Sequence, residues 1–139
     1  MIRWRIHLKS PPPMVYAMLA TDEGRARFWA ESAVEQNGVI EFEFPGGLSW
    51  RGKVLEAKPP DRFVIEYYDS SLTTFVLDDD GSGGTDLTLT DEGVPPAHLA
   101  EVMAGWVSVL MALKAAVDFS VDLRNHDPQR TWNEGYADN

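Results

Sequence analysis

Hydrophobic and polar residues alternate in the first segment of the chain, where one face of residues 2–8 carries Ile2, Trp4, Ile6 and Leu8. A period of two with a polar opposite face is typical of a half-buried antiparallel strand. Similar short runs return between residues 32 and 90, separated by turn residues. Asn37-Gly38 is a strong hairpin signal, because both residues tolerate positive φ. We therefore predict about seven strands in one antiparallel meander.

Helical patterns flank this predicted sheet on both sides. Pro11-Pro12-Pro13 suits the start of a short helix, because proline has a preset φ and lacks an N–H group. Thr21 is expected to cap a second short helix that ends near Phe28-Trp29. After Pro95-Pro96, apolar residues follow one helical face through about four turns. They are Val102, Trp106, Val109, Leu110, Leu113 and Val117.

The order of these elements predicts a single α+β domain over residues 1–139. A sheet with one apolar face needs a cover, and the last helix is the only predicted element long enough to supply it. A twisted sheet that wraps around this helix is the economical arrangement. The polar tail, residues 125–139, holds Trp132 and Tyr136, which we expect to dock on the body of the domain.

Composition narrows the functional classes. The formal net charge of −10 opposes binding to phosphate backbones, so no nucleic-acid partner is expected. The absence of cysteine excludes a disulfide framework and fits a reducing compartment. No signal peptide is recognisable, and no segment is expected to be apolar enough to insert in a membrane. The expected location is cytoplasmic.

Short motifs distributed over most of the chain resemble the SRPBCC (START/Bet v 1-like) superfamily. Within it, they are similar to the C-terminal domain of the activator of Hsp90 ATPase. The motifs are Pro13-Met14-Val15-Tyr16, Trp29, Phe42-Glu43-Phe44, Gly52-Lys53-Val54, Pro59-Pro60-Asp61-Arg62, Thr73-Thr74-Phe75, Gly84-Thr85-Asp86-Leu87-Thr88-Leu89, and Gly105-Trp106 with Leu110, Leu113 and Lys114.

This resemblance implies a helix-grip fold with a cavity between the curved sheet and the C-terminal helix. Members of the superfamily bind lipids, sterols, hormones or polyketides, and some are cyclases. The expected ligand-binding residues are Phe42, Phe44, Trp50, Val54, Phe63, Ile65, Tyr67, Phe75, Leu87, Val102, Trp106, Val109, Leu110 and Leu113. The alternative for the aromatic members is that they only fill the core.

Sites of other chemistry find little support in the sequence. The acidic stretch from Asp78 to Asp86 lacks the ligand spacing of an EF-hand and is expected to be a solvated hairpin loop. His7, His98 and His126 have no partners at metal-ligand spacing. We therefore expect no metal, no cofactor and no identifiable catalytic residue.

Three functional hypotheses follow. The first is a binding protein that holds an apolar or amphipathic small molecule, lipid-like or polyketide-like, in the cavity. The second is an interaction module that regulates an Hsp90-type chaperone or another protein through an exposed apolar face. The third is an enzyme of the cyclase or dehydratase type, which needs a polar pair inside the cavity. The sequence leaves monomer and homodimer both open.

Overall fold

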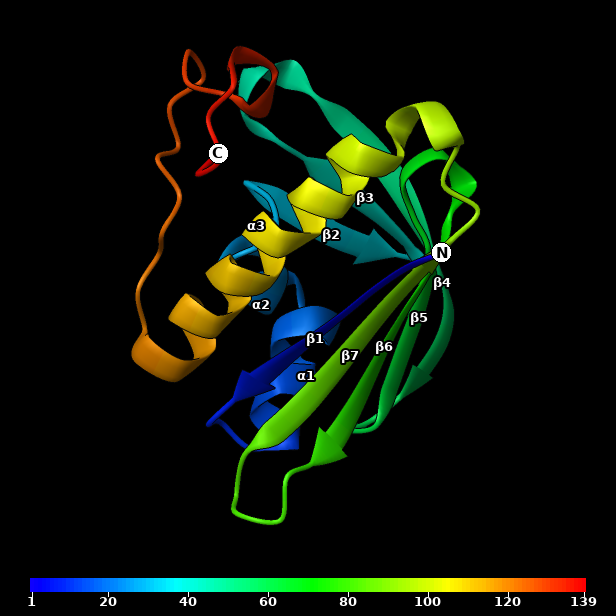
Figure 1. Ribbon diagram of the computed structural model, residues 1–139, viewed down its shortest axis with the longest axis vertical. Coiled ribbons are helices and arrows are strands. Elements are labelled where there is room, and N and C mark those ends of the chain that lie inside the picture. The colour runs from blue at the N-terminus through cyan, green and yellow to red at the C-terminus, as the bar shows by residue number, and fades with distance from the viewer.

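The computed structural model describes all residues from 1 to 139, which form one curved sheet and three α-helices (Figure 1). The sheet is antiparallel, with seven strands in the order β1-β7-β6-β5-β4-β3-β2. The strands are β1 Ile2–Leu8, β2 Ser32–Gln36, β3 Val39–Glu43, β4 Ser49–Lys58, β5 Arg62–Glu66, β6 Leu72–Asp79 and β7 Thr85–Glu92. The helices are α1 Pro12–Ala20, α2 Asp22–Ala26 and α3 Leu99–Phe119. The predicted helix-grip architecture is confirmed.

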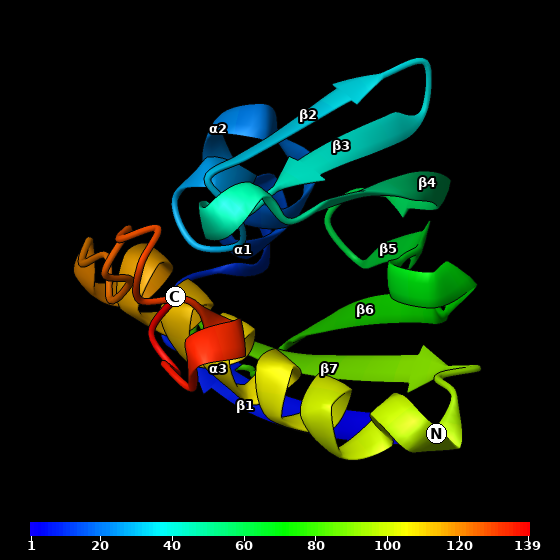
Figure 2. The same cartoon turned by 90° about the horizontal axis from the view of Figure 1, so that it is seen from above.

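The sheet bends strongly, so that its two end strands approach opposite sides of one interior (Figure 2). Helix α3 runs along the β1 and β7 side, whereas α2 contacts β2 and α1 reaches β5 and β6. The bend is the expected result of strand twist in a sheet that must enclose a helix.

Local signals set most element boundaries. Asn37 and Gly38 have φ of 54° and 78°, which closes the β2–β3 hairpin with Gln36 opposite Val39. Thr21 accepts a hydrogen bond from the Gly24 N–H at 3.0 Å and so caps α2, as its position predicts. Helix α1 begins at Pro12, within the predicted proline run.

The concave face of the sheet carries the core. Its buried side chains alternate along the strands, as the period of two predicts, and include Ile40, Phe42, Phe63, Ile65, Phe75, Leu77, Leu87 and Leu89. Trp4 departs from the expected pattern, because it is 36% exposed while Ile2 and Leu8 are fully buried. Strand β1 lies at the edge of the sheet, and an edge strand has a neighbour on one side only.

Helix α3 is more apolar than we expected. The segment Pro96–Phe119 has 24 residues, and an 18-residue window within it has a mean hydropathy of 1.6, which by length and composition alone is enough to cross a membrane. The buried core helix of a folded domain can meet the same criterion. One face of the helix explains much of the apolar content, since Trp106, Leu110 and Leu113 are buried against the sheet.

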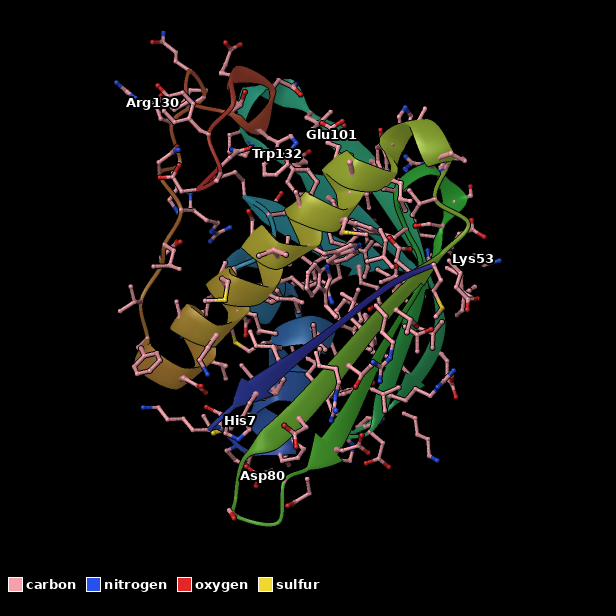
Figure 3. All side chains as sticks on the ribbon, viewed as in Figure 1. His7, Lys53, Asp80, Glu101, Arg130 and Trp132 are labelled. Carbon is pink, nitrogen blue, oxygen red and sulfur yellow. The ribbon has the colours of Figure 1, made fainter.

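After α3 the chain turns at Ser120 and runs back along the helix as an extended tail (Figure 1). The Arg124 guanidinium donates to the carbonyl oxygens of Ala30 at 2.8 Å and Ala26 at 2.7 Å. Farther along, the Trp132 indole donates to Glu101 of α3 at 3.0 Å. Figure 3 shows Trp132 and Glu101 side by side at the upper end of the helix. Tyr136 stays 41% exposed.

Arg25 is a charged residue whose side chain is fully buried. Its guanidinium donates to the carbonyl oxygens of Ala33 at 3.0 Å and Leu19 at 3.1 Å, and it pairs with the Asp22 carboxylate. Burial lowers the pKa of Arg25, and Asp22 counteracts this effect. The side chain thereby joins the end of α1 to the start of β2.

Replacing Arg25 with Met should lower the free energy of unfolding by about 3 kcal/mol, because two buried carbonyl oxygens lose their donor. Urea denaturation measures this loss. Arg62→Met is the matched control, since Arg62 pairs with Glu56 at the surface and should cost less than about 1 kcal/mol. Equal stability of the two variants would contradict the structural role of Arg25.

Candidate functional site

The interior opens into a pocket of about 240 Å³ at the N-terminal half of α3. Three parts of the chain build its wall: the β3–β5 part of the sheet, α3 and the tail. Most of the lining side chains are aromatic or aliphatic, including Trp29, Phe44, Leu48, Trp50, Tyr67, Tyr68, Val102, Trp106, Val109 and Trp132. Polar side chains reach it from His98, Glu101, Ser108, Asn133 and Asn139.

The expected ligand-binding residues divide into two groups. The pocket brings together Phe44, Trp50, Tyr67, Val102, Trp106 and Val109. The others lie in or against the packed core instead, namely Phe42, Val54, Phe63, Ile65, Phe75, Leu87, Leu110 and Leu113. Rings fill the middle of the concave face, as in the contact of Phe63 with Phe75 at 6.4 Å between centroids, so these side chains belong to the packed core.

Several pocket residues carry no local signal in the sequence. Trp29 lies after α2 and Tyr68 follows β5, and each reaches the pocket only because the sheet is curved. Trp132, Asn133, Ala137 and Asn139 come from the tail, whose docking places them opposite α3. Gly105 also lines the pocket, and a Cβ atom built there would meet open space.

An aromatic cluster forms the floor of the pocket. The Tyr67 ring lies 5.2 Å from Trp106, 5.5 Å from Trp29 and 5.6 Å from Trp50, between ring centroids. Phe44 packs on Trp50 at 4.4 Å. Such ring pairs gain stability beyond the burial of their area and hold one another in place.

Tyr67 places a hydroxyl group inside this cluster. Its oxygen accepts a hydrogen bond from the Trp29 indole at 3.0 Å. The Trp50 indole N–H faces the same oxygen but lacks hydrogen-bond geometry, and its nitrogen is buried without a partner. Burial raises the pKa of the Tyr67 hydroxyl, and the two indoles reverse only part of this shift. The hydroxyl is therefore protonated at neutral pH.

A buried carboxylate positions the other large ring. Asp91 at the end of β7 is 1% exposed and accepts hydrogen bonds from the Trp106 indole at 2.8 Å and from the Thr73 hydroxyl at 3.0 Å. Thr73 and Asp91 lie opposite each other in the β6–β7 ladder. This arrangement fixes the orientation of the Trp106 indole, so its ring forms a stable wall of the pocket.

His126 holds the tail through two carboxylates. Its Nδ1 lies 2.6 Å from Glu31 Oε1 and its Nε2 lies 2.7 Å from Asp122 Oδ2. An ionised carboxylate only accepts hydrogen bonds, so both ring nitrogens must carry protons to satisfy both contacts. The hydrogen bonds to Asp122 and Glu31 raise the pKa of His126, while partial burial and nearby Arg124 oppose the shift.

A second cavity of about 230 Å³ lies between the outer side of α3 and the tail. Val107, Met111 and Leu123 contribute apolar surface to it. It shares Trp29, Ser108, Val109, Ala137 and Asn139 with the pocket described above. The last residues of the tail therefore separate two neighbouring cavities.

The acidic hairpin loop does not form a cluster of metal ligands, and no group of three His, Asp or Glu residues in the chain has that arrangement. Instead, Asp80 accepts hydrogen bonds from His7 at 2.8 Å and from the backbone N–H groups of Ser82 and Gly84. These contacts, that of His7 first, lower the pKa of Asp80 to about 2. Figure 3 shows His7 and Asp80 together at the end of the sheet far from Trp132.

Comparison with known families gives a match over residues 9–118 to the family described as Activator of Hsp90 ATPase homolog 1-like protein. The chain belongs to this family. With the curved sheet and the long C-terminal helix, the match confirms the resemblance to the SRPBCC superfamily. A comparison with curated proteins found no match.

Several solved structures are similar to this chain. The protein SSP2350 from Staphylococcus saprophyticus has a TM-score of 0.75 and 18% identity, over 88% of this chain and 95% of that one. The Aha1 dimer from Colwellia psychrerythraea has a TM-score of 0.74 and 22% identity, over 85% of this chain and 96% of that one. CalU16 from Micromonospora echinospora has a TM-score of 0.67 and 24% identity, over 85% of this chain and 76% of that one. At these identities the likeness shows the shared fold.

The contribution of His126 to stability should depend on pH. The folded protein holds the His126 proton more tightly than the unfolded chain, so the contribution is complete below the unfolded pKa of about 6.5 and is lost as pH rises through the higher folded pKa. Denaturation of the wild type and of His126→Asn at a series of pH values measures this difference.

The stability advantage of the wild type should be constant below the unfolded pKa of about 6.5 and should shrink as pH rises through the higher folded pKa. His98→Asn is the control, since His98 makes no hydrogen bond to a carboxylate. A wild-type advantage that is the same at all pH values would show that His126 is not the proton-dependent contact.

Proposed function

We propose that this protein binds an apolar small molecule in the pocket between the sheet, α3 and the tail. The observation that carries the proposal is the pocket itself, an aromatic-lined space of about 240 Å³ bounded by both rigid and extended segments. Ligand sites are typically concave and mostly apolar, with a few polar groups that orient the ligand. The pocket is likewise mostly lined by apolar and aromatic side chains, and Tyr67, Ser108 and Asn133 add a few polar groups.

The size of the pocket limits the ligand. An apolar cavity of about 150 Å³ accommodates benzene, and pockets for drug-sized ligands begin near 300 Å³. The pocket thus suits a molecule of about two rings, or one end of a longer chain. Burial of such a ligand is favourable by about 25 cal/mol per Å² of apolar surface, before the costs of association.

Two of the polar groups in the pocket, Tyr67 and Glu101, do not favour the third hypothesis, that of a cyclase or dehydratase. A general base needs a pKa near the working pH, whereas burial raises the pKa of Tyr67 further from that range. The Glu101 carboxylate is engaged by the Trp132 indole. We therefore propose binding without a reaction.

Gly105 offers a direct test, because a side chain placed there points into open space at the pocket. Gly105→Phe should weaken binding of the neutral fluorescent probe N-phenyl-1-naphthylamine about tenfold or more by filling the pocket. The helix should not be destabilised, since glycine costs about 1 kcal/mol relative to alanine inside a helix. Fluorescence titration measures the affinity.

Ala104→Phe is the matched control, because Ala104 is exposed and adjacent on α3. It should leave probe binding unchanged. If the probe binds folded Gly105→Phe as tightly as the wild type, the pocket is not the binding site.

A second candidate is docking of another protein on the outer face of α3, first of all a second copy of this chain. Met103, Val107 and Met111 are 37%, 40% and 49% exposed and lie four residues apart, so they form one apolar stripe. Exposed contiguous apolar surface of this kind is typical of interaction sites. The related Colwellia structure is a dimer, which supports self-association.

Val107→Glu tests this candidate, because a charge in the stripe would be desolvated by a docked partner. Sedimentation velocity should show the wild type associating as its concentration rises and Val107→Glu remaining monomeric. Leu55→Glu serves as the control, since Leu55 is 47% exposed on β4. A wild type that is monomeric at all concentrations would reject self-docking.

A further inference from the structure

Tyr67 has a hydrogen-bond capacity that the protein itself does not use. A tyrosine hydroxyl has one proton to donate and lone pairs to accept. The oxygen accepts from Trp29, but no group of the protein accepts the Tyr67 proton. The Trp50 indole N–H faces this oxygen as well and does not accept the proton. The Tyr67 O–H donor is therefore left unused at the floor of the pocket.

Such unpaired donors are costly, and native proteins seldom leave them without a role. Tyr67 is 8% exposed and Trp50 is partly buried, so both are held by the aromatic cluster rather than free to turn toward bulk solvent. Burial raises the pKa of Tyr67, which keeps its proton in place at neutral pH. The pocket therefore offers a donor, and its apolar floor offers no competing acceptor.

The negative charge around the pocket favours a ligand with a neutral acceptor over one with an anionic acceptor. The chain has a net charge of −10, and Asp91 and Glu101 lie close to the pocket wall. An anionic ligand would meet repulsion from this field, and its desolvation is expensive. A neutral oxygen acceptor has neither cost.

We propose that Tyr67 is a specificity-determining residue that donates a hydrogen bond to a neutral oxygen acceptor, such as a ketone, ester or amide carbonyl, on an apolar ring-shaped ligand. This inference rests on the proposed binding function and adds the class of ligand. The rings of Trp106 and Phe44 cover the apolar part of the ligand. A hydrocarbon of the same shape leaves the Tyr67 donor unpaired.

The probes are indane and 1-indanone, which share a two-ring skeleton and differ by one carbonyl group. Both are titrated into the wild type and Tyr67→Phe, with the tryptophan indole N–H resonances followed by NMR. Tyr67→Phe should weaken 1-indanone about fivefold to tenfold and change indane by less than about twofold, because only the ketone loses a hydrogen bond. Comparing the two probes cancels their different hydrophobicity.

Tyr136→Phe is the matched control, since this tyrosine is 41% exposed outside the pocket, and it should alter neither affinity. If both probes bind and weaken equally in Tyr67→Phe, the donor role of Tyr67 is overturned while the binding function stands. If neither probe shifts the pocket tryptophans of the wild type, the binding function itself fails. Tighter binding of indane-1-carboxylate than of 1-indanone would overturn the preference for a neutral acceptor.

A second readout needs no variant. The carbonyl stretching band of 1-indanone bound to the wild type should move to lower wavenumber than in an apolar solvent, as expected for a carbonyl that accepts hydrogen bonds. A band at the apolar-solvent position would overturn the proposal even if Tyr67→Phe failed to fold.

Discussion

The hydrogen bond between the Trp106 indole and the buried Asp91 carboxylate ties the N-terminal half of α3 to the sheet. Asp91 is itself held by Thr73, its neighbour across the ladder, so the acceptor belongs to the rigid sheet. A buried carboxylate without its donors would be strongly unfavourable, so the folded state requires both hydrogen bonds to Asp91. Once Trp106 is in place, Trp29 and Tyr67 pack against it. The floor of the pocket follows from one inter-element contact.

The parts of the fold that the sequence predicts are those with local causes. The positive φ of Asn37 and Gly38 closes a hairpin, the Thr21 side chain caps a helix, and alternation along each strand selects its buried face. Each of these effects acts within a few residues, so a single sequence reveals it. Trp4 shows the limit of such reasoning, because its exposure depends on β1 being an edge strand.

The site depends on contacts between distant segments, and this is why only part of it could be predicted. Alternation places Phe63 and Phe75 on the concave face correctly, but it carries no information on whether rings meet and fill the space there. Trp132 reaches α3 across 31 positions of sequence, and His126 reaches Glu31 across 95. No periodic pattern encodes these pairings, because they follow from the path of an irregular tail.

The tail lies outside the part of the chain that matches the family. The family match ends at residue 118, whereas Trp132, Asn133, Ala137 and Asn139 lie beyond it and form one wall of the pocket. The scaffold and the enclosing wall therefore come from separable stretches of chain. A change confined to the tail would therefore reshape the enclosed space while leaving the curved sheet and the long helix as they are.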